Sequence, residues 1–159
     1  MKAFSFYILL TLIPVFFKPG VVNITWVDKL TGDYSFAKKC TLQCNAWCYE
    51  YAGTNKLITT AGKNDTLYCS TAMNEATHCS LHLTITKNYC LPTIVLTSIA
   101  PGGDKVYEHK DGYIKIDSIL WKQHILKAVF DFTFLNNEND KNIFWKGKIY
   151  TKYGALKRK

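Results

Sequence analysis

The sequence predicts an all-β fold, and we expect a disulfide-stapled two-sheet β-sandwich over residues 21–156, with a barrel as the alternative. Three observations favour this class. Apolar and polar residues alternate with a period of two along several segments. Turn-forming residues separate about eight or nine such short segments, and none has a convincing helical period. The six cysteines are an even number, which is typical of secreted domains held by disulfides.

Residues 1–20 have the composition of a secretory signal peptide. A lysine precedes an almost wholly apolar run over residues 3–17, and Lys-Pro-Gly follows it. The run is shorter than the roughly 20 residues of a membrane-spanning helix, although an uncleaved signal anchor is the alternative. We therefore expect a secreted, extracellular protein with one domain over 21–156 and a basic tail at 157–159.

The first part of the domain contains two candidate strands. Residues 22–27 alternate in the manner of a strand. Within residues 40–51, even positions from 40 to 48 hold Cys, Leu and Ala, whereas odd positions hold Thr, Gln, Asn, Trp and Tyr. We interpret this segment as a strand because Thr, Trp and Tyr favour sheets, but cysteines four residues apart also fit one face of a helix.

The middle of the chain contains the clearest strand. Over residues 79–86 the alternation is complete, so Cys79, Leu81, Leu83 and Ile85 should face the core. Residues 93–97 are apolar on both sides, as in a central strand. Residues 113–117 alternate again, and 101–104 and 110–112 have the composition of turns.

The last part predicts a long hairpin. Leu126, Ala128, Phe130, Phe132 and Phe134 share one face, and residues 136–140 form a polar turn. In the second strand, Ile143, Trp145 and Ile149 share a face, while Lys146 and Lys148 point to the opposite side. Immunoglobulin-like, C2-like and transthyretin-like sandwiches all fit this strand pattern, although the cysteines are too crowded for the usual immunoglobulin spacing.

We expect all the cysteines to be paired in disulfides: Cys40, Cys44, Cys48, Cys69, Cys79 and Cys90. Fifteen pairings are possible, and the sequence does not select one. Zinc binding is less expected, because the spacing lacks a Cys-x-x-Cys pair. We predict no metal and no cofactor. Residues 91–159 contain no cysteine, so strand pairing and burial must hold them.

Two sequons accompany the predicted secretion. They begin at Asn23 and Asn64, and Asn64 lies in a run with turn composition, where it should be exposed. We predict N-glycosylation, with Asn64 the better candidate.

The charge predicts anionic extracellular partners. The net charge is +8, and 19 of the 20 basic residues are lysine. Lysine lacks the planar guanidinium that recognises phosphate or sulfate bidentately. A basic cluster is concentrated near the end of the chain, at Lys146, Lys148, Lys152, Lys157, Arg158 and Lys159. In a secreted protein, sulfated glycans, anionic lipids and acidic proteins can bind such a cluster, and nucleic acid is not expected.

The sequence contains no recognisable catalytic motif. There is no Gly-x-Ser-x-Gly elbow, phosphate loop or dinucleotide fingerprint. His78 and His82 lie four residues apart on a strand, about 13 Å from each other, which is too far to share one metal ion. We therefore predict that the protein is not an enzyme.

Two functional hypotheses follow. The leading one is a secreted binding protein that acts on an extracellular protein, glycan or anionic surface. It includes a possible aromatic face formed by Trp47, Tyr49 and Tyr51. The alternative is a carrier of a small apolar ligand or lipid, whose cavity would be lined by Phe130, Phe132, Phe134 and Trp145.

Overall fold

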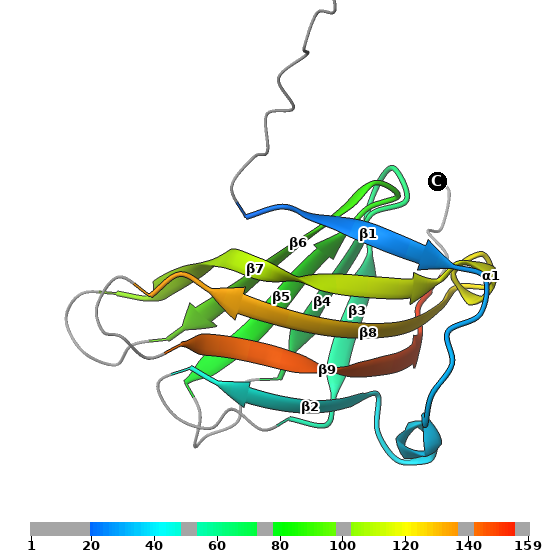
Figure 1. Cartoon of the computed structure of the whole chain (residues 1–159), viewed down its shortest axis with the longest axis horizontal. Helices are drawn as coiled ribbons and strands as arrows, with labels where there is room; N and C mark the ends of the chain where they lie inside the picture. The colour runs from blue at the N-terminus through cyan, green and yellow to red at the C-terminus, as the bar shows by residue number, and fades with distance from the viewer. Residues whose placement is uncertain (1–19, 49–53, 73–77, 98–102, 137–141, 155–159) are drawn as a thin grey trace, which may run out of the picture.

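A computed structural model describes residues 20–48, 54–72, 78–97, 103–136 and 142–154 (Figure 1). They form nine strands: β1 Val22–Val27, β2 Leu42–Trp47, β3 Leu57–Ala61, β4 Leu67–Thr71, β5 Cys79–Ile85, β6 Tyr89–Leu96, β7 Lys105–Asp117, β8 Ile125–Phe134 and β9 Ile143–Lys152. A 3₁₀ turn, η1 Ser35–Lys38, and a short helix, α1 Ser118–Trp121, connect strands. Neither is long and apolar enough to cross a membrane, and the same holds for every helix in the described ranges. The predicted all-β class is confirmed.

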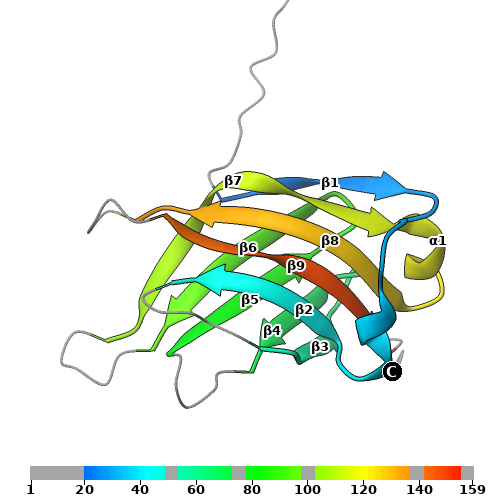
Figure 2. The same cartoon turned by 60° about the horizontal axis from the view of Figure 1, so that its bottom comes forward.

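The strands form one continuous mixed sheet in the order β2-β9-β8-β7-β1-β6-β5-β4-β3, which curls until it is nearly barrel-shaped (Figure 2). Strands β3 to β9 follow one another as an antiparallel meander. Strand β2 adds antiparallel to β9, whereas β1 is parallel to β7. The four strands from β3 to β6 lie behind β7, β8, β9 and β2 (Figure 1).

The predicted division into two separate sheets is not confirmed, because β1 and β7 belong to both layers. The first half of β7 pairs with β6, and its second half pairs with β8. Strand β1 lies where β6 and β7 diverge: Val22 and Asn23 pair with β6, and residues 24–27 pair with β7. Hydrogen bonds therefore continue from the back layer to the front layer.

The core lies between the two layers and follows the predicted alternation. Leu81, Leu83 and Ile85 of β5 are fully buried, as are Ile114 and Ile116 of β7. The predicted hairpin is confirmed as β8 and β9, paired from Ile125 opposite Lys152 to Phe134 opposite Ile143. All eight of its predicted inward side chains are buried: Leu126, Ala128, Phe130, Phe132, Phe134, Ile143, Trp145 and Ile149.

The two candidate strands of the N-terminal half both belong to the sheet. Residues 22–27 form β1, and residues 42–47 form the strand β2 rather than a helix. Strand β2 is at the end of the sheet order, and its first residues contact the segment before β3: the Thr41 and Leu42 amides both donate to the Asn55 carbonyl, at 3.0 and 3.3 Å. These bonds bring the two ends of the sheet together and nearly close the barrel.

The turn predicted at residues 110–112 is wrong. These residues lie inside β7, where the register with β8 shifts between His109 and Asp111. The irregularity is a β-bulge, and Gly112 has a φ of +129°. Lys-Asp-Gly favours positive φ in either setting, so its composition does not distinguish a bulge from a hairpin turn.

His109 occupies the inner side of this bulge. Its ring is edge-on to Phe132 and Phe134, with centroid distances of 5.7 and 6.4 Å. Its Nε2 atom is buried and makes no hydrogen bond within the described part of the chain. Burial lowers the pKa of His109, although a backbone hydrogen bond and the charge of Asp111 act in the opposite direction. The imidazole is therefore neutral in the folded state at neutral pH.

We expect stability to fall as the pH drops below about 6.5, the pKa of histidine in an unfolded chain. As the pH falls, His109 is protonated in the unfolded chain before it is protonated in the folded protein. Its contribution to the free energy of unfolding is therefore complete above pH 6.5 and is lost as the pH falls to the lower pKa of the folded state. One proton limits the slope to about 1.4 kcal/mol per pH unit. Urea unfolding between pH 7.5 and 5 measures this slope, and His109→Phe should flatten it. Burial also lowers the pKa of His82, so His82→Asn serves as the comparison. It should leave unchanged the part of the pH dependence of stability that is due to His109. Equal slopes for wild type and His109→Phe would contradict the assignment.

Candidate functional site

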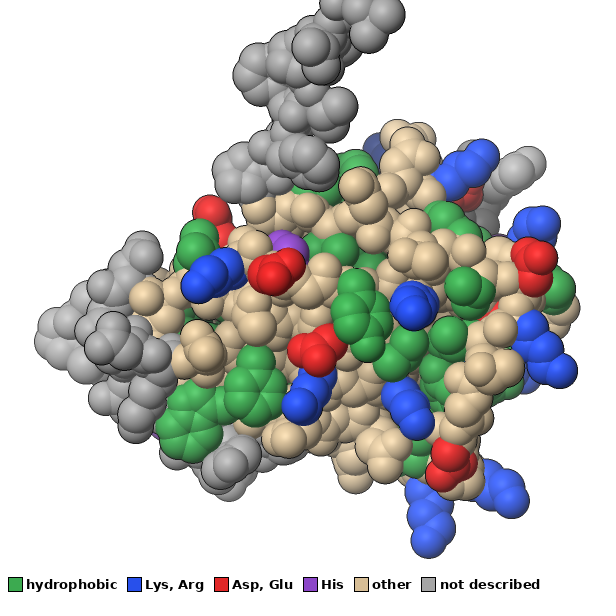
Figure 3. All heavy atoms as spheres, in the orientation of Figure 1, with side chains coloured by type: hydrophobic (Ala, Val, Ile, Leu, Met, Phe, Trp, Pro, Cys, Tyr) green, Lys and Arg blue, Asp and Glu red, His purple; other side chains and the backbone are tan. Residues whose placement is uncertain are grey.

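The outer face of β7, β8, β9 and β2 carries two neighbouring rows of side chains. The first row contains Tyr113, Asp131, Lys146 and Asn45, and the second contains Lys115, Val129, Lys148 and Gln43. Directly opposite side chains have Cβ atoms about 5 Å apart, and rows two residues apart are separated by about 6.7 Å along the strands. We call this surface, defined by these two rows, the basic face. Lysine side chains are spread across it, between aromatic side chains (Figure 3).

Lysine ammonium groups on this side of the sheet lie over aromatic rings. The distances from Nζ to the ring centroid are 5.5 Å for Lys115 over Tyr113, 5.5 Å for Lys146 over Phe144, 5.6 Å for Lys148 over Tyr34 and 4.6 Å for Lys127 over Tyr34. A ring face attracts a cation through its quadrupole and carries no net charge of its own. The rings therefore position the lysines without neutralising them.

The segment between β1 and β2 covers one end of the basic face. The Tyr34 hydroxyl donates to the Ala128 carbonyl at 3.2 Å, and Lys148 Nζ donates to the Asp33 carbonyl at 3.1 Å. Burial, with the charge of Asp117, raises the pKa of Tyr34 to about 12. Tyr34 thus remains a neutral donor at physiological pH, and the segment fixes Lys148 at the boundary of the face.

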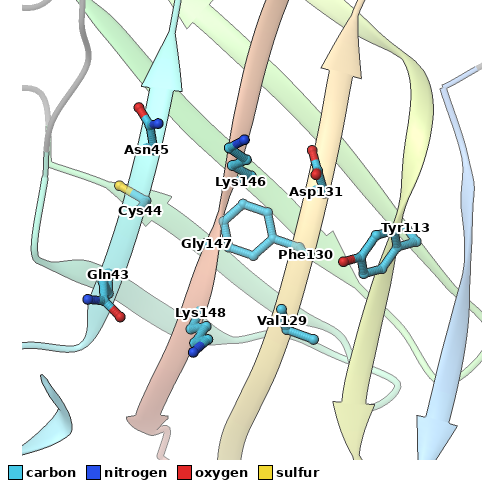
Figure 4. A pocket seen from close by; sticks show the side chains of 10 residues that line it. All are labelled: Gln43, Cys44, Asn45, Tyr113, Val129, Phe130, Asp131, Lys146, Gly147 and Lys148. Carbon is cyan, nitrogen blue, oxygen red and sulfur yellow. The ribbon is translucent and has the colours of Figure 1, made fainter. Parts of the chain in front are cut away.

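A groove of about 440 Å³ runs across the basic face (Figure 4). Gln43 and Asn45 line it from β2, Lys146 and Lys148 from β9, Asp131 from β8, and Tyr113 from β7. Amide groups donate and accept hydrogen bonds, the carboxylate accepts, and the ammonium groups only donate. The groove therefore combines cationic, hydroxyl-binding and aromatic groups on one open surface.

Gly147 lies at the floor of the groove, where β2 approaches β9 closely. A Cβ atom at this position would overlap the carbonyl oxygen of Gln43 and would lie within 2.9 Å of Cys44. The ring of Phe130 lies beside Gly147 in the close view (Figure 4). The absence of a side chain thus permits the spacing that brings the β2 amides next to the β9 lysines.

The structure brings together part of each predicted binding surface. Lys146 and Lys148 project from the same face, as the alternation of β9 predicted, and Lys152 is exposed at the end of that strand. Trp47 is half-buried in a third row on this side, opposite Phe144. The predicted residues Tyr49, Tyr51, Lys157, Arg158 and Lys159 lie outside the described residues.

The disulfide prediction is confirmed for one pair. Cys48 and Cys79 are bonded and connect the end of β2 to the start of β5. Four cysteines are unpaired in this structure: Cys40, Cys44, Cys69 and Cys90. Cys69 and Cys90 lie on β4 and β6, with β5 between them. Both thiols are buried, and burial raises the pKa of each, to about 12 for Cys69.

Comparisons with protein-family models, with curated proteins and with solved structures gave no match to this chain.

One pair of side chains has the composition of a nucleophile and a base. Ser80 Oγ and His82 Nε2 are 2.9 Å apart on β5. The alternation of β5 places Ser80 on the same side as His82, yet Ser80 is only 8% exposed. The small pocket beside His82 is not lined by Ser80. A nucleophile must reach its substrate, so this contact is better explained as satisfying the buried hydroxyl. Among the described residues, no group of three or more His, Cys, Asp or Glu side chains is placed to hold a metal ion.

Both sequon asparagines are exposed. Asn23 is on β1, and Asn64 is in the turn between β3 and β4 with a φ of 54°. The turn position of Asn64 agrees with the sequence, and its glycosylation stays a prediction.

The grouping of several residues in the groove is not evident from the sequence. Strand alternation places Asp131 on the outer face of its strand, opposite the inward Phe130 and Phe132, but it does not show that Asp131 lies beside Lys146. The neighbours Tyr113 and Asn45 depend on the order and register of four strands, which no local pattern encodes.

Proposed function

We propose that this protein is a secreted, non-enzymatic binding protein whose basic face binds an acidic extracellular partner. The observation that carries the proposal is the groove between Lys146, Lys148 and the β2 amides, which contains a single carboxylate, that of Asp131. Exposed sequon asparagines and the disulfide between β2 and β5 agree with an extracellular location. We expect the partner to carry closely spaced negative charges. Lysines within a Debye length of one another, about 8 Å, act jointly on such a partner.

The carrier hypothesis has less support. The four rings that would line a cavity are buried by one another and by the opposite layer, with exposures of 0 to 2%. Phe130 and Phe132 stack at a centroid distance of 5.1 Å. These rings contribute to a packed core between the layers.

Replacing Lys146 and Lys148 by Ser is expected to weaken binding to heparin, used here as a polyanion. Each lysine near an anionic surface contributes about 1 kcal/mol, so the double variant should bind roughly 30-fold more weakly at physiological salt. Elution from a heparin column in a salt gradient measures the effect.

The matched control changes Lys63 and Lys87 to Ser. Both are exposed in connections of the other layer, and the control has the same net charge as the test variant. It should elute close to wild type. Identical elution of the two double variants would show that only net charge matters, and the basic face would then have no binding role. A further variant without residues 157–159 separates the contribution of the tail.

A further inference from the structure

We infer that the groove on the basic face holds an acidic sugar chain, with the acid group over β9 and β2 and a sugar ring against Tyr113. This inference rests on the proposed function and specifies the ligand of the same site. It assigns different tasks to the two ends of the groove, which are lined by different chemical groups.

The β9–β2 end is suited to a carboxylate or sulfate. Lys146 and Lys148 are two residues apart on one face of β9, so their Cα atoms are about 6.7 Å apart. Asn45 is directly opposite Lys146, and Gln43 is directly opposite Lys148. Each ammonium group therefore has an amide beside it, Lys146 on the Phe144 side and Lys148 on the Tyr34 side, and both pairs offer donors to anionic oxygens.

The β8–β7 end is suited to hydroxyl groups and an apolar ring face. Asp131 would repel an anion placed beside it, but its carboxylate accepts hydrogen bonds from hydroxyls. Tyr113, directly opposite Asp131, is 44% exposed and offers a ring with a polar tip. Lys115 holds this ring by lying over it at 5.5 Å. A sugar presents both hydroxyls and a carbon-bound apolar face, so it matches this end.

The length and the lining of the groove favour an acidic sugar chain over a membrane surface. The groove crosses four neighbouring strands, which corresponds to roughly 14 Å at the usual strand spacing. It is lined by amide, ammonium, carboxylate and phenol groups, which together can bind the acid groups and the hydroxyls of a sugar. An anionic membrane would contact the outermost lysines and would not depend on Tyr113 or Asn45.

The test measures affinity for a heparin oligosaccharide by calorimetry, with Tyr113→Ala compared with Tyr89→Ala. Tyr89 is similarly exposed, at 40%, but lies on β6 in the other layer. Loss of an aromatic contact of about 0.5–1.5 kcal/mol corresponds to about 2- to 10-fold weaker binding. We expect this loss for Tyr113→Ala with an unchanged dependence on salt, and no loss for Tyr89→Ala. Asp131→Asn should bind more tightly, because a repelling charge is removed without changing the shape of the groove.

Other anions identify the class of ligand. Hyaluronan should also bind through its carboxylates, whereas neutral dextran, polyglutamate and vesicles of phosphatidylserine should bind weakly. Equal affinity for polyglutamate or vesicles, or no effect of Tyr113→Ala, would overturn the sugar assignment. Such a result would leave the proposed function intact provided that the Lys146 and Lys148 variant still loses heparin affinity. If that variant binds like its control, the proposed function itself fails.

Discussion

Removing the Cys48–Cys79 disulfide by a double change to Ala is expected to lower the free energy of unfolding by about 3–4 kcal/mol. The bond closes a loop with a sequence separation of 31 residues, and the chain-entropy relation for a loop of this length gives that magnitude. The bond also connects β2 in the front layer with β5 in the back layer. It lies at the C-terminal end of β2, whereas the hydrogen bonds to Asn55, before β3, are at the N-terminal end of β2. Urea unfolding of the oxidised protein measures the loss.

The matched control is Cys40→Ala. This thiol is unpaired and half-buried, and it makes one weak hydrogen bond, to the Phe36 carbonyl at 3.4 Å. The control should lie within about 1 kcal/mol of wild type. Peptide mapping without reduction should recover Cys48 joined to Cys79. A double variant as stable as the control, or a map that joins Cys48 to another cysteine, would contradict the structure.

Gly112→Ala is expected to destabilise the protein by at least about 3 kcal/mol. Two costs act together: a φ of +129° is strained for any residue with a side chain, and the new Cβ would overlap the carbonyl oxygen of Asp131 on β8. The clash is with backbone, so only a shift of β8 against β7 can relieve it. Thermal or urea unfolding measures the cost, and heparin affinity should fall as well, since Tyr113 and Asp131 adjoin the bulge.

Gly103→Ala separates the two costs. Gly103 also has a positive φ, of +78°, but a Cβ there would meet no heavy atom of the described residues within 4 Å. Gly103→Ala should therefore lower the free energy of unfolding only by the cost of the strained φ, about 1–2 kcal/mol. Equal losses for the two variants would mean that the bulge leaves room for a methyl group, and the close contact between β7 and β8 would be incorrect.

The period-two pattern predicted which residues of β5, β8 and β9 face the core, because burial on one side of a strand imposes that alternation directly. It missed β3, whose Leu57-Ile58-Thr59-Thr60-Ala61 sequence does not alternate cleanly, yet Leu57 is buried and Ile58 is exposed. It also placed a turn inside β7, since Lys110-Asp111-Gly112 has the composition of a turn and the bulge uses the same residues.

The candidate site was predictable only within single strands. Lys146 and Lys148 were assigned correctly to one outer face, because that assignment requires only that successive side chains of β9 point to opposite faces. Their neighbours Asn45 and Tyr113 come from strands that are remote in sequence, and Tyr34 reaches the face from the segment between β1 and β2. These contacts follow from strand order, and strand order depends on packing energies that a local pattern does not contain.

The position of β1 has a consequence for how the chain assembles. Strand β1 leaves the ribosome before any of its partners, but it lies between β6 and β7, which are made much later. The meander from β3 to β9 can form from neighbouring hairpins, whereas β1 must pair across long sequence separations, which slows folding. Until β1 inserts, part of the edges of β6 and β7 presents unpaired backbone groups, and such edges attract strands of other chains. The nascent protein is therefore most prone to aggregation in the interval after β6 and β7 have formed and before β1 pairs with them.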